Sequence, residues 1–526
     1  MVKKESSDEI EVGKFVMNVL KNKYFQWSVT IILFLLILYS STALRLGNLN
    51  VLKSQVDEGV YLSNDLDSML FYRQAETRME LGYWPEYDEM RSPGYNTPWI
   101  RELINDVLIW NYKVLNFFDS SINFNYASTV SAPIFFAIGL ILFFILSLLL
   151  TKSKIGSLAA VTFLAYAPGF LFRSIAGFYD HDHLGVFTLF AVMIIGVLSF
   201  RYFERNYKNL VIWGIILGFF TSLMLYSWGG GITFLLVFLP LAFLLHYLFN
   251  VENKERFVLF YLIWFVTSIV FTPILGMKAG QMYDRFLDSQ GILVLFVLGF
   301  SIIDMLIYRF KDRLKFLNEK YLHGYSFGVT AILGSIGLFV IGKNPVRLFN
   351  KAWATLIYPF FGEFGDRLGS TVAENAQPYL VDLINQNGKI LFWLFLIGMV
   401  VISINFVKNS RSLKNKFILA SSIIALLFAI LISRISPDHT LNGENFISQT
   451  IYLLGGLIFL GAIGYVYMRE KFKIDIELIF LFSVALTTVV NARAAIRSFF
   501  LITPFIALIA GYFIAELVKK LEIENE

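Results

Sequence analysis

Residues 132–150 read APIFFAIGLILFFILSLLL and contain no charged side chain. An apolar helix of about 20 residues crosses a hydrocarbon core of about 30 Å. Similar runs recur along the chain and predict an all-α polytopic membrane protein with about 13–14 transmembrane helices, because the runs at 157–172 and 476–491 are short for a full span. The predicted spans are 27–44, 132–150, 157–172, 184–200, 209–227, 232–249, 257–275, 290–308, 326–342, 388–407, 416–433, 449–467, 476–491 and 498–517.

The composition agrees with a membrane protein. Of 526 residues, 57% are hydrophobic and only 16% are charged, whereas an ordinary soluble protein carries about 25% charged residues. This balance excludes a set of soluble domains and a disordered chain. The chain has no cysteine, so disulfides, thiolate metal sites and cysteine nucleophiles are excluded. A net charge of +5 is too small to indicate nucleic-acid binding.

Lysine and arginine in the short loops predict the orientation. With a cytoplasmic N-terminus, the basic loops fall inside, at 151–155, 201–208, 253–256, 308–320, 408–416, 469–473 and 519–520. We therefore expect a multi-pass protein of the cell membrane with its active site on the extracytoplasmic face. It would comprise a cytoplasmic segment (1–24), a transmembrane catalytic domain (25–518) and a short tail (519–526), without a soluble C-terminal domain.

Two extracytoplasmic segments, the first and the fifth, are long in this topology. They run from about residue 45 to 131 and from about 343 to 389. Loops of this length are usually functional or ordered by packing. Within the first, residues 102–118 have the pattern of an amphipathic helix that lies on the membrane surface.

Acidic residues gather in the predicted outer loops. Asp65 and Asp67 follow the first span, and Arg73 comes six residues after Asp67. These carboxylates suit the N-terminus of a helix, where negative charge is favoured. Helix capping with a surface ion pair explains the string as well as a functional site does.

A second outer loop carries four ionisable side chains in a row: Asp180, His181, Asp182 and His183. Carboxylate oxygens suit magnesium or manganese, and imidazole shifts the preference towards manganese, iron or zinc. The alternative is a polar turn that keeps two helices in register. Charged residues at a membrane boundary are usually functional, which favours a metal or substrate site.

Two further features lie in the later outer segments. Glu374 is a single carboxylate among small and polar residues, and by itself it would be an ordinary loop residue. Arg493 and Arg497 are four residues apart and would share one face of a helix. Arginine on the outer side departs from the positive-inside trend and suits an anion such as phosphate, although snorkelling at the interface is the alternative.

Together these strings resemble the catalytic subunit of oligosaccharyltransferase, a membrane glycosyltransferase with the GT-C fold. Asp67 matches the early aspartate of that family, and Arg173 precedes a pair like Asp-x-Asp by seven residues. Thr371-Val-Ala-Glu374 matches its Thr-x-x-Glu motif, and Arg497 lies seven residues before Pro504, as the family's late arginine does. The resemblance covers most of the chain.

Two departures accompany this resemblance. The family normally continues into a soluble domain with a Trp-Trp-Asp-Tyr-Gly motif, and this sequence contains no Trp-Trp pair. Glu374 and Arg497 are 123 residues apart, about twice the usual separation, which suggests two inserted spans between them. A partner protein that supplies acceptor recognition is therefore part of the expectation.

The resemblance implies roles for the candidate residues. Asp67 and Glu374 would be catalytic, and Asp67, Asp180, Asp182 and Glu374 would bind Mn²⁺ or Mg²⁺. Arg497, Arg173, His183 and Arg493 would contact the substrate. The donor would be an oligosaccharide on a polyprenyl or dolichyl phosphate or diphosphate held in membrane lipid, and the acceptor an asparagine of a polypeptide. A glycosyltransferase with another acceptor, and a transporter or flippase, remain as alternatives.

Overall fold

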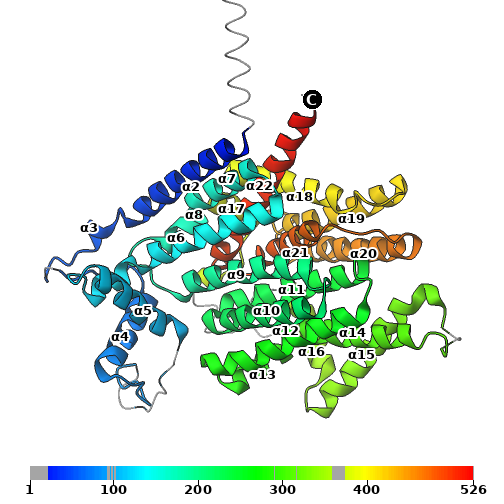
Figure 1. The fold of residues 1–526 in the computed structure, drawn as a ribbon, viewed down its shortest axis with the longest axis horizontal. Coiled ribbons are helices and arrows are strands. Elements are labelled where there is room, and N and C mark those ends of the chain that lie inside the picture. The colour runs from blue at the N-terminus through cyan, green and yellow to red at the C-terminus, as the bar shows by residue number, and fades with distance from the viewer. Residues whose placement is uncertain are drawn as a thin grey trace, which may run out of the picture.

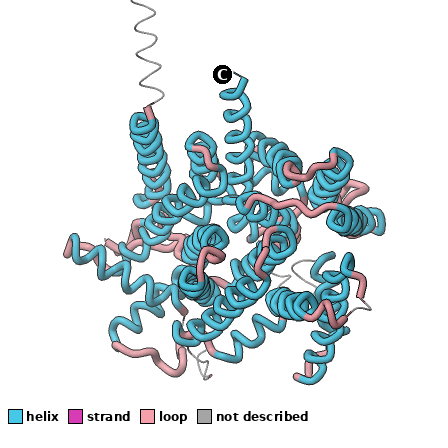
Figure 2. Tube along the Cα trace, turned by 45° about the vertical axis from the view of Figure 1, so that its right-hand side comes forward, coloured by secondary structure: helices cyan, strands magenta, loops and turns pink. Residues whose placement is uncertain are grey.

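The computed structural model of the protein describes residues 22–57, 59–91, 95, 99, 102–288, 291–314, 317–357 and 373–524. Helices dominate this part of the chain (Figure 2), and the isolated β-bridges within it join Lys53 to Tyr61 and Arg434 to Asn442. The predicted all-α class is confirmed.

The first half of the chain begins with the span α2, which packs against α6 and α7, and continues through the helices α3, α4 and α5 of the first long segment (Figure 1). The elements are α2 (Lys23–Leu46), α3 (Leu49–Leu52), α4 (Leu66–Leu81), α5 (Leu103–Phe118), α6 (Phe124–Thr151), α7 (Lys154–Tyr166), α8 (Pro168–Leu171), η1 (Phe172–Ser174), α9 (His181–Tyr202), α10 (Tyr207–Ser227) and α11 (Gly229–Phe249). The predicted amphipathic helix at 102–118 is α5, which buries Ile104 and Leu108 and exposes Phe117 and Phe118.

The second half continues the bundle and ends in its most buried span, α22. Its elements are α12 (Lys254–Leu275), α13 (Ala279–Leu287), α14 (Ile292–Arg309), η2 (Glu319–Tyr321), α15 (Leu322–Val340), α16 (Pro345–Ile357), η4 (Ala373–Asn375), α17 (Leu380–Asn387), α18 (Lys389–Phe406), α19 (Leu413–Ile432), α20 (Phe446–Arg469), α21 (Ile476–Asn491) and α22 (Ser498–Glu524). The chain therefore crosses the membrane many times, as predicted.

Every predicted span coincides with a helix, but two differ from a simple crossing. Twelve helices in the described ranges are long and apolar enough to span a membrane, or thirteen if one bent pair counts as a span. The bent pair replaces the predicted straight span at 157–172, and α21 is a shorter apolar helix of 16 residues.

The bend between α7 and α8 has a local cause. Pro168 has no backbone N–H and disfavours the helical conformation at the residue before it. Ala167 accordingly takes an extended conformation, with φ −66° and ψ 125°, and the two helices meet at 65°. The bend turns the chain so that η1, which carries Arg173, follows directly at the end of the bundle.

The core forms around α22, which packs closely against α7. A Cβ on Gly156 would come within 2.6 Å of the Ala515 Cβ, and a Cβ on Gly511 within 2.5 Å of the Gly156 carbonyl oxygen. Glycine at this crossing permits the two backbones to approach, as small residues do between membrane helices. The span containing α15 is 11% buried and lies at the edge of the bundle, whereas that of α22 is 83% buried.

The long separation between Glu374 and Arg497 contains the helices α19 and α20. Helices α19 and α20 pack mainly on each other, and the α20 span is only 22% buried. Helices α21 and α22 return to the core against α18 and α6. The hairpin therefore adds length to the chain without separating Glu374 from the start of α22.

Candidate active site

The start of α9 positions two of the predicted carboxylates. Asp180 is the N-cap residue, and its side chain accepts a hydrogen bond from the backbone N–H of His181 at 2.6 Å. Asp182 lies in the first helical turn and is almost fully buried. Both positions favour negative charge because the N-terminal N–H groups of a helix point towards them.

Arg173 is held near these acids by contacts made by its chain neighbours. Phe170 on α8 stacks on Phe500 of α22, with ring centroids 4.3 Å apart. The fully buried Arg45 at the end of α2 donates hydrogen bonds to the Ser174 hydroxyl at 2.8 Å and to the Ala165 carbonyl at 2.9 Å. The backbone around Arg173 is therefore fixed from two sides.

The guanidinium of Arg173 joins three carboxylates. Its Nη1 lies 2.5 Å from Asp182 Oδ2 and 3.8 Å from Asp180 Oδ2, and its Nη2 forms an ion pair with Glu374. Glu374 is 201 residues away in the sequence and lies on η4. The structure thus brings the second and third predicted loops into direct contact.

Glu374 also lies beside Arg497, as the resemblance implied. The Arg497 backbone N–H donates to the Glu374 carbonyl oxygen at 3.0 Å, and its Nη1 donates to Asn375 Oδ1 at 3.3 Å. The Arg497 side chain is exposed, so it faces the open side of the site. Thr371, the first residue of the predicted motif, lies outside the described residues.

Asp67 joins the same region from the first long segment. Asp65 is the N-cap residue of α4, so the capping interpretation is correct for Asp65, and Asp67 follows it in the first turn. Burial and the neighbouring Asp65 raise the pKa of Asp67, Glu374 adds to this rise, and His181 and Arg497 oppose it. The next residue, Ser68, accepts a hydrogen bond from the Tyr179 backbone N–H at 2.8 Å, so Asp67 lies beside the segment that leads into α9.

Negative charge is crowded at this end of the bundle. Burial raises the pKa of Asp180, and the charges of Asp182 and Asp67 raise it further. In the described part of the chain, no three acidic or histidine side chains are arranged to hold a metal ion. The guanidinium of Arg173 contacts both Asp182 and Glu374 instead.

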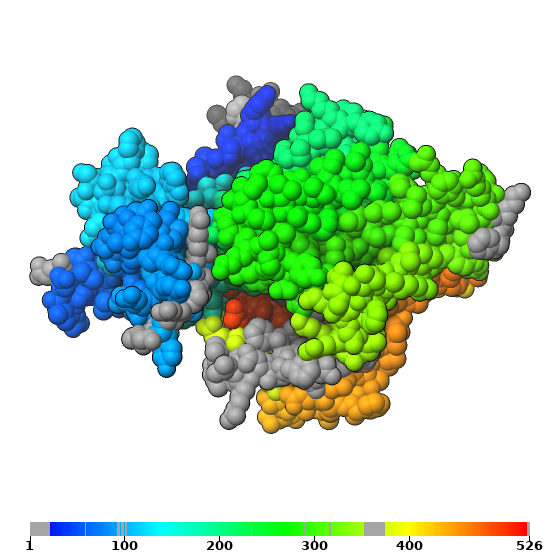
Figure 3. Space-filling view, turned by 90° about the horizontal axis from the view of Figure 1, so that it is seen from below, coloured from blue at the N-terminus to red at the C-terminus, as the bar shows by residue number. Residues whose placement is uncertain are grey.

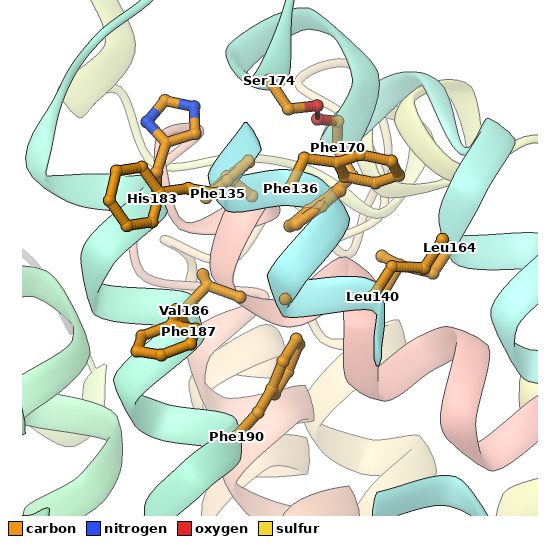
Figure 4. Close-up of a pocket in the computed structure, with 12 residues that line it drawn as sticks. Phe135, Phe136, Leu140, Leu164, Phe170, Ser174, His183, Val186, Phe187 and Phe190 are labelled. Atoms are coloured by element: carbon orange, nitrogen blue, oxygen red, sulfur yellow. Dashed lines mark hydrogen bonds between the residues drawn. The ribbon is translucent and has the colours of Figure 1, made fainter. Parts of the chain in front are cut away.

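The two histidines of the second loop have structural partners. Both ring nitrogens of His183 face backbone carbonyls, those of Asp180 at 3.0 Å and of Arg173. The His181 ring pairs with Glu102 at 3.0 Å, which joins α9 to the start of α5. Figure 4 shows His183 above a pocket lined mostly by aromatic and aliphatic side chains, with Ser174 nearby.

Arg493 contacts a different part of the bundle, the hairpin of α19 and α20. The chain leaves the helical conformation after Asn491, so Arg493 and Arg497 do not share a helix face. Arg493 is buried, donates to the Ser433 hydroxyl at 2.7 Å and lies over the Tyr452 ring. It joins the end of α21 to the hairpin of α19 and α20.

Two residues that support the site, Arg45 and Glu102, were not predicted from the sequence. Arg45 stands at the end of an apolar run, where arginine usually extends to the membrane surface. Glu102 stands at the start of an amphipathic helix, where it reads as a first-turn acid. Neither pattern indicates the long-range partners, Ser174 and His181, that the fold supplies.

The described part of the chain is thus a multi-pass membrane protein in which loops collect acidic and arginine side chains at one end of a helix bundle. Seen from below the view of Figure 1, residues near the C-terminus are visible between the first-loop segment in blue and the green helices (Figure 3). The family model "Oligosaccharyl transferase STT3, N-terminal" matches residues 34–381, more than half of the chain. The chain belongs to this family of oligosaccharyltransferase catalytic subunits.

Solved structures of the Archaeoglobus fulgidus oligosaccharyltransferase share the fold. The complex of this enzyme, AglB, with an inhibitory peptide and a dolichol-phosphate has a TM-score of 0.56 at 16% identity, over 86% of this chain and 57% of that chain. The same protein tethered to an acceptor peptide with the NVT sequon has a TM-score of 0.52 at 19% identity, over 88% of this chain and 56% of that chain. The complex with zinc and sulfate has a TM-score of 0.50 at 17% identity, over 90% of this chain and 53% of that chain.

This chain therefore spans somewhat more than half the length of those proteins. At these identities the likeness shows the fold alone. A comparison with curated protein sequences gave no match.

Proposed function

We propose that the protein transfers an oligosaccharide from a polyprenyl or dolichyl phosphate or diphosphate to an asparagine of an acceptor polypeptide, on the extracytoplasmic face of the cell membrane. The observation that carries this proposal is the convergence of Asp67, Asp180, Asp182, Glu374 and Arg497 at one end of the bundle. The solved relatives support the substrate classes, since their complexes contain a dolichol-phosphate and an acceptor peptide.

The residues of the cluster fit a divalent cation by their chemistry. Four carboxylates, those of Asp67, Asp180, Asp182 and Glu374, face two guanidinium groups, which leaves a net negative charge that Mn²⁺ or Mg²⁺ would neutralise. When bound, such an ion stabilises negative charge on a departing phosphate. A relative binds zinc and sulfate, which supports a site for a divalent cation and an anion.

The chain's own residues would perform the remaining tasks. Arg497 is exposed beside Glu374, so its guanidinium can hold the carrier phosphate by paired hydrogen bonds. Asp67 and Glu374 would accept hydrogen bonds from the acceptor amide and so weaken its conjugation. As the amide nitrogen bonds to the anomeric carbon, the bond to the carrier phosphate breaks and one amide proton passes to a neighbouring carboxylate.

The test is transfer from a lipid-linked oligosaccharide to an Asn-x-Thr peptide, with and without Mn²⁺. Asp67→Asn and Glu374→Gln should each slow transfer by about 100-fold or more. Each variant removes a negative charge from the site in which the transition state would be stabilised electrostatically. Asp119→Asn is the matched control, since Asp119 is an acid of the same segment and its side chain accepts hydrogen bonds from the backbone N–H and the hydroxyl of Ser121.

Two outcomes would contradict this function. Consumption of the donor without glycosylation of the peptide would favour a glycosyltransferase with a lipid, a glycan or another protein site as acceptor. Movement of the donor across vesicle membranes without its consumption would favour a flippase. Transfer that appears only after another protein is added would indicate the partner for acceptor recognition.

A further inference from the structure

The guanidinium of Arg173 is a cation at the centre of an acidic cluster. It contacts Asp182 at 2.5 Å, forms an ion pair with Glu374 and lies 3.8 Å from Asp180. The Arg173 side chain is 13% exposed and that of Asp182 is 6% exposed. A planar fork with five N–H donors can join several carboxylates in this way.

A divalent cation shared by the same acids would need the same space. Carboxylate oxygens bind Mg²⁺ at about 2.0–2.1 Å, and the Arg173 nitrogen already lies 2.5 Å from Asp182. Two cations that shared these oxygens would lie only a few ångströms apart and would repel each other strongly at this depth. The guanidinium and the metal therefore compete for Asp182 and Glu374.

We propose that Arg173 neutralises these carboxylates while no metal is bound, and that the divalent cation enters by displacing its guanidinium. The inference rests on the proposed function, because it takes Asp180, Asp182 and Glu374 as metal ligands. The exchange replaces one positive charge by two, which suits a cluster in which carboxylates outnumber the arginines. No bond is broken in this step.

The backbone of Arg173 stays in place during the exchange. The His183 ring contacts the Arg173 carbonyl, and Arg45 holds the hydroxyl of Ser174, the next residue. The movement is therefore confined to the Arg173 side chain, which remains beside the metal. A released guanidinium is suited to a phosphate group, so metal and donor phosphate should strengthen each other's binding.

The test is Mn²⁺ binding by the 526-residue chain, measured through the electron paramagnetic resonance signal of free Mn²⁺ without donor or peptide. Arg173→Gln should bind Mn²⁺ about tenfold more tightly or better, because a competing charge is removed. Arg173→Lys should fall between this variant and the natural protein, because lysine keeps the charge but loses the fork.

Arg201→Gln is the matched control. Arg201 lies in the last turn of α9, 2.6 Å from Glu477, so its loss breaks a comparable ion pair at the other end of the helix that carries Asp182. Its Mn²⁺ affinity should be unchanged. Equal or weaker Mn²⁺ binding by both Arg173 variants would overturn the exchange, as would an equal gain in the control.

Thermal unfolding in a chelator gives an independent measurement. Arg173→Gln should lower Tm without metal, and added Mn²⁺ should raise Tm more in this variant than in the natural protein. An absence of any Mn²⁺ effect on either protein would contradict the exchange. Tighter Mn²⁺ binding by Arg173→Gln without any glycan transfer would leave the exchange in place and remove the proposed function.

Discussion

Two polar clusters of the bundle, one buried and one half-buried, have opposite balances of charge. Asp304 on α14 is a single carboxylate with a side chain only 2% exposed, and four side chains contact it. Tyr247 and Ser326 donate to it at 2.8 and 2.7 Å, His323 lies 2.8 Å away, and Lys254 completes an ion pair. Donors outnumber carboxylates here.

At the start of α9 the balance is reversed, because the single guanidinium of Arg173 contacts Asp180, Asp182 and Glu374. The first cluster is saturated and joins α11, α12, α14 and α15. The second has carboxylates in excess, which is the condition for taking up another cation. The difference separates a structural network from a site that is ready to bind a ligand.

The largest expected effect comes from removing a charge in the acid-rich cluster. Asp180→Asn should lower transfer by about 100-fold or more, whereas its Tm in a chelator should not fall. Asparagine still caps α9, and the variant removes a charge that burial, and then the charges of Asp182 and Asp67, disfavour, as the raised pKa of Asp180 indicates. Initial transfer rates and differential scanning fluorimetry provide the two measurements.

The reverse result is expected at the donor-rich cluster. Asp304→Asn should destabilise the fold by about 3 kcal/mol, because Lys254 would stay buried without its counter-ion. Transfer per folded molecule should not change. Ser326→Ala, which removes one neutral hydrogen bond, should cost only about 1 kcal/mol in a denaturant titration. If Asp304→Asn abolished transfer in folded protein, the assignment of a structural role to one cluster and a role in transfer to the other would be wrong.

A smaller effect is expected at Arg45, which supports the backbone next to Arg173. Arg45→Gln loses the guanidinium that reaches Ser174 and Ala165, so η1 should be held less firmly. We expect transfer to fall about tenfold, since a side chain misplaced by about 1 Å costs up to 100-fold. Unlike Arg173→Gln, this variant should not bind Mn²⁺ more tightly. A gain in Mn²⁺ affinity would show that Arg45 acts on the cation directly.

The smallest effect distinguishes the two late arginines. Arg493→Gln should leave the donor KM unchanged and cost about 1–2 kcal/mol of stability, because Arg493 contacts Ser433 and Tyr452. Arg497→Gln should raise the donor KM, because its side chain is exposed next to Glu374. A higher donor KM in Arg493→Gln would indicate that Arg493 contributes to donor binding.

The sequence predicts the fold well because a membrane span is a local property of about 20 residues. It predicts an apolar run at 157–172, and the 65° bend within this run has its local cause at Pro168. The stacking of Phe170 on Phe500, which fixes the direction of the bent segment, cannot be predicted from the sequence. The separate acidic strings are visible in the sequence. Their contacts are not, since Arg173 and Glu374 lie 201 residues apart.

The contacts within the polar clusters cannot be predicted from the sequence for the same reason. Asp304 is one acid near the end of an apolar run, and its contacts with Tyr247 and His323 depend on how three other helices pack. The prediction that Arg493 and Arg497 share a helix face was wrong for a related reason. A spacing of four residues predicts a shared face only if the helix continues, and α21 ends at Asn491.

The central claim is that Asp67 and Glu374 belong to one cation site. Mn²⁺ equilibrium dialysis of the natural protein, Asp67→Asn, Glu374→Gln and the double variant tests it most directly. A shared site predicts that each single variant loses the tightly bound Mn²⁺ and that the double variant loses little more. Retention of tight Mn²⁺ binding in both single variants, or independent losses that add in the double variant, would contradict the claim.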